Sequence, residues 1–145
     1  MKRVLHSPKD RDEIYQRFLA YVEEWRKRLI LREWEVNIHL KTEGETTGAT
    51  ARCVPKYHLV VINFTLPDDV ESCWSDEEIE DTAIHELIHV LIASWDDLWQ
   101  RTHKKPLPFR MLNMLTLLEE QLCDRLTTGF LRTKYPRRKA LKLTD

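Results

Sequence analysis

The first third of the chain changes from a helix-like to a strand-like spacing of its apolar residues. From Ile14 to Leu29, apolar side chains recur at steps of three and four residues, which is the spacing of one helix face. Ser7 and Pro8 suit a helix start, because serine caps free amide groups and proline is tolerated at the first helical position. We therefore expect a long amphipathic helix over residues 8–31.

Apolar and polar residues alternate from Trp34 to Leu40, as in a strand with one buried face. Two further segments, residues 49–54 and 58–66, are separated by Pro55, and the second is rich in β-branched residues, which favour strands. The pattern predicts a three-stranded sheet, which we expect to be antiparallel.

Two more helices are expected after the sheet. Ser75 begins the first, and Glu78 three residues later completes a capping box, in which the two residues satisfy each other's amide groups. This helix is expected to run to about Trp99, and the next covers residues 109–128, with Gly129 placed to end it. The order of elements predicts an α+β fold.

The length and composition are those of one small globular domain. A chain of 145 residues, 42% hydrophobic and 32% charged, can bury one core but not a second independent one. We expect residues 1–131 to form this domain and residues 132–145 to be a basic C-terminal tail. The N-terminus lacks the apolar run of a secretory signal, so we expect a cytoplasmic protein.

The first helix after the sheet contains the sequence His85-Glu86-Leu87-Ile88-His89. Residues four apart lie on the same side of a helix, so the two imidazoles can bind one metal ion. Glu86 is displaced around the helix and could accept a proton from a water molecule on the metal. Zinc lowers the pKa of a bound water to about 7. The motif therefore predicts zinc-assisted hydrolysis.

A catalytic zinc ion takes three protein ligands and leaves a position for water. The following helix offers Glu120 and Asp124, which share one helix face. Glu120 could bind the metal while Asp124 holds the far nitrogen of a ligand histidine. Two other candidates for the third ligand remain. Glu119 lies at the centre of that helix's apolar stripe, and His103 lies fourteen residues after His89, in a polar turn that leads to Pro106.

The HExxH motif in one helix and E-x-x-x-D in the next resemble the gluzincin group of zinc peptidases. The stretch from Trp34 to His85 is similar to small, minimal metallopeptidases of the phage and bacterial type, and the whole resemblance covers residues 30–130. It implies a zincin-like fold and a bound zinc ion. It also implies the following roles: metal ligands His85, His89 and Glu120, general base Glu86, and Asp124 as the hydrogen-bond partner of a ligand histidine.

Peptide-bond hydrolysis is the leading hypothesis, with a peptide or protein as substrate. A non-catalytic, zinc-stabilised binding module is the main alternative, but a purely structural site needs no base such as Glu86 beside the metal. With His103 as third ligand, the chain would instead be similar to proteases of the SprT group, which act on proteins attached to DNA.

A net charge of -1 argues against a general nucleic-acid binder, and no membrane partner is expected. The activity of a small cytoplasmic peptidase must be limited, and a regulatory protein partner is one candidate for this role.

Overall fold

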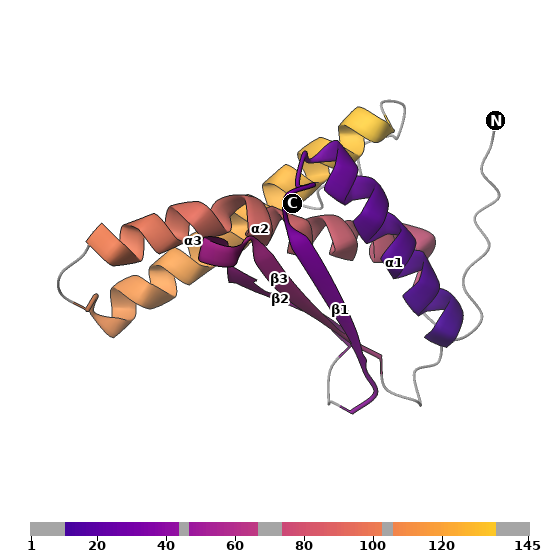
Figure 1. Cartoon of the computed structure of the whole chain (residues 1–145), viewed down its shortest axis with the longest axis horizontal. Coiled ribbons are helices and arrows are strands. Elements are labelled where there is room, and N and C mark those ends of the chain that lie inside the picture. The colour runs from indigo at the N-terminus through magenta and orange to yellow at the C-terminus, as the bar shows by residue number, and fades with distance from the viewer. Residues whose placement is uncertain (1–10, 44–46, 67–73, 103–105, 136–145) are drawn as a thin grey trace, which may run out of the picture. The chain divides into compact units, whose positions relative to one another are not determined.

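The computed structural model describes residues 11–43, 47–66, 74–102 and 106–135. It divides into two compact units, residues 1–106 and residues 107–145. The elements form the α+β fold expected from the sequence (Figure 1). The first unit contains α1 (Arg11–Arg28), β1 (Glu35–Lys41), β2 (Gly48–Val54), the 3-10 helix η1 (Pro55–Tyr57), β3 (Leu59–Thr65) and α2 (Asp76–Thr102), and the second contains α3 (Phe109–Lys134).

The helix and strand boundaries agree with the sequence pattern to within a few residues, with one exception. α3 continues through Gly129 to Lys134, so the predicted helix end at Gly129 was wrong. A glycine inside a helix costs only about 1 kcal/mol relative to alanine, which the turns that follow can offset. The first predicted cap, Ser7 and Pro8, lies outside the described residues. Within the described part of the chain, none of the three helices has the length and apolar composition needed to cross a bilayer.

The three strands form a mixed sheet in the order β1-β3-β2. β2 and β3 are antiparallel, but β1 pairs with β3 in parallel, so the expectation of an entirely antiparallel sheet was wrong for that pair. The short η1 turns the chain directly from β2 into β3 and makes these two strands a hairpin. β3 then lies between β1 and β2. The two edge strands are therefore separated by two strand spacings, or about 10 Å. The six residues 42–47 that join the edge strands are long enough to cover this distance.

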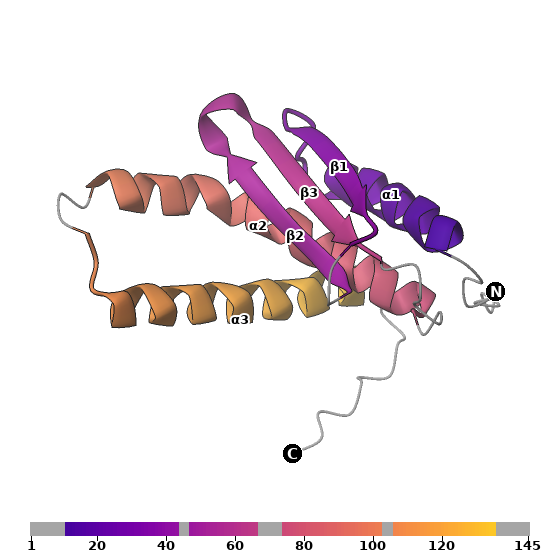
Figure 2. The same ribbon diagram turned by 90° about the horizontal axis from the view of Figure 1, so that it is seen from below.

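β3 is central because it is the most apolar of the three strands. Its inward side chains Val60, Ile62 and Phe64 are completely buried, and they pair in register with alternate residues of both edge strands. α1 and α2 lie against this inner face of the sheet (Figure 2). The core therefore lies between one face of the sheet and two helices.

Aromatic rings join α1 to the sheet. Phe18 of α1 stacks on Phe64 of β3 with ring centroids 4.1 Å apart, and Trp74, just before α2, meets the edge of the same Phe64 ring at 5.6 Å. Offset stacked and edge-to-face contacts of this kind add to the free energy gained from burial alone. These rings fix α1 and the start of α2 against the central strand.

α1 ends in a turn that would normally require glycine. The amide of Leu31 donates to the carbonyl of Arg26, and the amide of Ile30 donates to the carbonyl of Lys27, which is the hydrogen-bond pattern of a Schellman cap. Ile30 has a φ of 58° and is 77% exposed. A β-branched side chain in this left-handed conformation is strained, and its exposure offers little compensating burial. Leu31, by contrast, is buried and anchors the turn.

Replacing Ile30 with glycine should stabilise the first unit. Glycine adopts the left-handed conformation without strain, and we expect the free energy of unfolding to rise by about 1 kcal/mol after allowing for the entropy that glycine adds to the unfolded chain. Urea denaturation at an unchanged m-value measures this difference. The matched control is Arg28→Gly, at the last ordinary helical position, which should destabilise by a similar amount. Equal destabilisation by both glycines would contradict the strain at Ile30.

Candidate metal centre

α2 begins where the capping box predicts. The hydroxyl of Ser75 accepts from the amide of Glu78 at 3.2 Å, and the carboxylate of Glu78 accepts from the amide of Ser75 at 2.7 Å. These reciprocal bonds satisfy amide groups that have no partner within the helix. Three acidic residues in the first turn also complement the positive end of the helix dipole. The helix that carries the HExxH motif is therefore fixed at its start by local sequence.

His85 and His89 lie one turn apart on α2, and their rings approach each other closely. The two Nε2 atoms are 3.2 Å apart, and the ring planes meet at 66°. Both side chains are half-buried, so they are accessible to a small ligand without being fully solvated. The sequence prediction that these two imidazoles converge on one point is confirmed.

The spacing of the two nitrogens fits a shared metal ion. Zinc binds imidazole nitrogen at about 2.0–2.1 Å in tetrahedral geometry, which separates two such nitrogens by about 3.3 Å. The observed 3.2 Å agrees with this value. The same distance would also let one imidazole donate a hydrogen bond to the other, depending on the tautomer. The pair could hold a metal ion.

Glu86 is buried on the same helix, between the two histidines in sequence. Its side chain is only 5% exposed. Helix geometry turns it about 100° from His85 and about 60° from His89, so it lies to one side of the direction in which the two imidazoles point. A carboxylate buried beside two imidazoles, but displaced from their axis, suits proton transfer better than metal binding.

The candidates for a third ligand lie on α3, in the second unit. On this helix Glu120 and Asp124 are one turn apart, as the sequence spacing requires, and so are Glu119 and Cys123. Cys123 was not among the ligands expected from the sequence, although a thiolate is a common zinc ligand. Its position one turn after Glu119 was the sequence feature that could have identified it as a candidate ligand. His103 lies outside the described residues.

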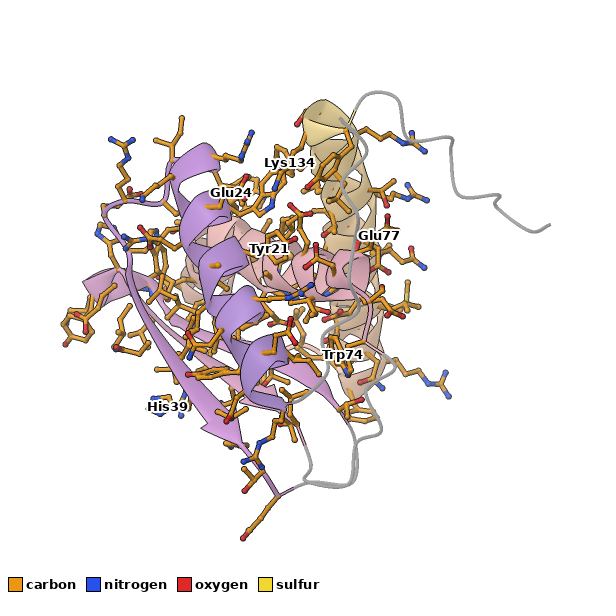
Figure 3. The ribbon with its side chains drawn as sticks, turned by 90° about the vertical axis from the view of Figure 1, so that its right-hand side faces the viewer. Tyr21, Glu24, His39, Trp74, Glu77 and Lys134 are labelled. Atoms are coloured by element: carbon orange, nitrogen blue, oxygen red, sulfur yellow. The ribbon has the colours of Figure 1, made fainter. Side chains whose placement is uncertain are left out.

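Two other histidines of the first unit have different surroundings. His39 projects from the exposed face of β1 (Figure 3). His58 follows η1 with a φ of 48° and lies against the ring of Trp34, with centroids 5.5 Å apart. Both are remote in sequence from the pair on α2, and His39 provides a surface control for it.

The histidine pair predicts a zinc site that depends on both imidazoles. We expect the wild-type protein to bind one zinc ion and His89→Ala to weaken that affinity by more than about 100-fold, since removal of a ligand should cost at least as much as removal of its supporting hydrogen bond. Competition with a chromogenic chelator measures both affinities. His39→Ala should bind zinc like the wild type. A wild-type protein that takes up no zinc, or two variants with equal affinity, would contradict the site.

Comparison of the chain with protein-family models, with curated proteins and with solved structures found no significant match.

Proposed function

We propose that this protein is a zinc-dependent peptidase with its reaction centre on α2. The observation that carries the proposal is the pair of Nε2 atoms 3.2 Å apart, with a buried carboxylate, Glu86, on the intervening turn. A purely structural zinc site does not need that carboxylate. The α+β fold, with the motif helix against a small sheet, supports the further proposal that the fold is zincin-like.

The proposed roles follow the chemistry of each side chain. His85 and His89 would bind the metal through Nε2, and Glu120 of α3 would be the third ligand, with Asp124 holding the far nitrogen of a histidine. When bound, zinc would make a water molecule acidic near neutral pH and polarise the peptide carbonyl. Glu86 would take a proton from the attacking water on a carboxylate oxygen and deliver it to the leaving nitrogen. Both products then carry ordinary termini, and no other reactant is required.

β2 is the proposed binding edge for the substrate. It is an edge strand of the sheet, and it contacts α2. An extended peptide could add to its outer side through main-chain hydrogen bonds, which demand little of the peptide's sequence. In a strand, alternate residues direct their amides to the same side. Substrate peptides N-methylated at single positions should therefore lose cleavage at every second position, and uniform sensitivity would argue against this edge.

Glu86→Gln tests the proton-transfer role. Glutamine has nearly the same shape but cannot accept the proton, so we expect kcat to fall by about 10²- to 10⁴-fold while the zinc content stays at the wild-type level. Peptide hydrolysis and metal analysis on the same preparation give both values. Unchanged hydrolysis would exclude Glu86 as the base. A wild-type protein that holds zinc but cleaves no peptide would favour the non-catalytic binding module.

Metal analysis of single variants tests the third ligand. Glu120→Ala should lower zinc affinity, whereas Glu119→Ala and Cys123→Ser should leave it near the wild-type value, because the proposal assigns the metal to Glu120 alone on α3. His103→Ala should also have no effect. Loss of zinc in Cys123→Ser would indicate that the third ligand is the Cys123 thiolate and not the Glu120 carboxylate. Loss of zinc in His103→Ala would favour the SprT-like arrangement.

A further inference from the structure

A row of polar side chains crosses the interface between α1 and α2. α1 contributes Arg17, Tyr21 and Trp25, at steps of four residues, and Figure 3 shows Tyr21 on this helix. α2 contributes Asp76 and Glu80, also four residues apart. Asp76 accepts from Arg17 at 3.0 Å and from the Tyr21 hydroxyl at 2.6 Å. The indole N–H of Trp25 donates to Glu80 at 2.8 Å. We call these five residues the polar row.

Four of the five side chains in the polar row are buried in the first unit, and the fifth, Arg17, is half-buried. Trp25 and Glu80 are each 1% exposed, and Asp76 is 8% exposed. Desolvation opposes the charge on Arg17, but hydrogen bonds to Glu13 and Asp76 outweigh it and raise the pKa of the guanidinium above its ordinary value. Buried ion pairs add little net stability, because desolvation cancels much of their attraction. Their best-attested role is to fix how two elements align.

The polar row and the histidine pair occupy opposite sides of α2. Asp76 and His85 are nine residues apart, and so are Glu80 and His89. Nine residues make about two and a half turns of an α-helix, which places the two pairs on opposite sides. Any rotation of α2 that moves the carboxylates relative to α1 therefore also moves the imidazoles.

Apolar burial alone defines the rotation of α2 about its axis less sharply than the hydrogen bonds of the polar row do. Hydrophobic contacts are not directional, and the buried apolar residues of this helix extend around about half of its circumference. A helix of this kind can rotate by a small angle and still keep most of that surface buried. The residues concerned are Ile79, Ala83, Ile84, Leu87, Ile88 and Val90.

We propose that the polar row is a positioning device that sets the rotation of α2 about its axis and so aims His85 and His89. The inference rests on the proposed zinc site. A rotation of about 20° would move an imidazole that lies about 5–6 Å from the helix axis by about 2 Å. The two histidines would move together and keep their spacing, but they would lose alignment with a third ligand and with β2. Metal and substrate sites tolerate displacements of only about 0.5 Å.

The test compares two uncharged substitutions of Glu80, of which only one keeps a hydrogen-bond acceptor. Glu80→Gln keeps an oxygen that can accept from Trp25, whereas Glu80→Leu has a similar size but no acceptor. We expect zinc affinity in Glu80→Gln to stay within about twofold of the wild type and in Glu80→Leu to fall about tenfold, the lower end of the loss seen when a residue that orients a metal site is removed. The unfolding free energy of Glu80→Leu should not fall in proportion, because apolar replacement of buried polar groups is often neutral.

Val22→Ala controls for simple loss of stability. Val22 is a buried apolar residue of α1 beside the polar row, so its truncation should lower the unfolding free energy and leave zinc affinity unchanged while the protein is folded. Zinc affinity that follows stability across all three variants would overturn the inference. If the wild-type protein binds no zinc, the proposed function fails instead. NMR structures of the metal-free variants then decide the inference, because only Glu80→Leu should show a rotated α2.

Discussion

Two carboxylates of α2 are buried in the first unit, and α1 supplies hydrogen-bond donors to both of them. Asp76 and Glu80 repeat at the same four-residue step as Arg17, Tyr21 and Trp25. Arg17 and Tyr21 both bond to Asp76, and Trp25 bonds to Glu80 one turn further along both helices. An unmatched buried carboxylate would cost far more free energy than any single apolar contact in this core returns. The arrangement of α1 and α2 is therefore strongly specified, and α2 carries the histidine pair.

The parts of the fold that depend on neighbouring residues could be predicted from the sequence. The capping box at Ser75 and Glu78 acts within one helical turn, and its hydrogen bonds form as expected. The convergence of His85 and His89 is equally local, because the helix alone sets the direction of residues four apart. Local rules of this kind need no knowledge of what packs against the helix.

The features that the sequence did not predict are those set by distant segments. Alternation shows that β1, β2 and β3 are strands with one buried face, but it carries no information about which strand pairs with which or in which direction. The parallel pairing of β1 with β3 follows from where the β2–β3 hairpin docks. The third ligand is a similar case, since helical spacing fixes Glu119, Glu120, Cys123 and Asp124 only relative to one another. The polar row could not be predicted either, because the spacing of its residues on each helix is that of an ordinary amphipathic helix and does not show which residues pair across the two helices.

The position of β3 between the other two strands affects how the sheet can assemble. β1 and β2 are made first during synthesis, yet neither pairs with the other, and both have all their ladder hydrogen bonds to β3. A nascent chain that ends before Leu59 therefore contains two strand sequences and no native strand pair. The ladders begin with the local β2–β3 hairpin, and the parallel ladder to β1 must close a longer loop of chain, which is entropically more expensive. Neither ladder of the sheet can form until its last strand has been synthesised.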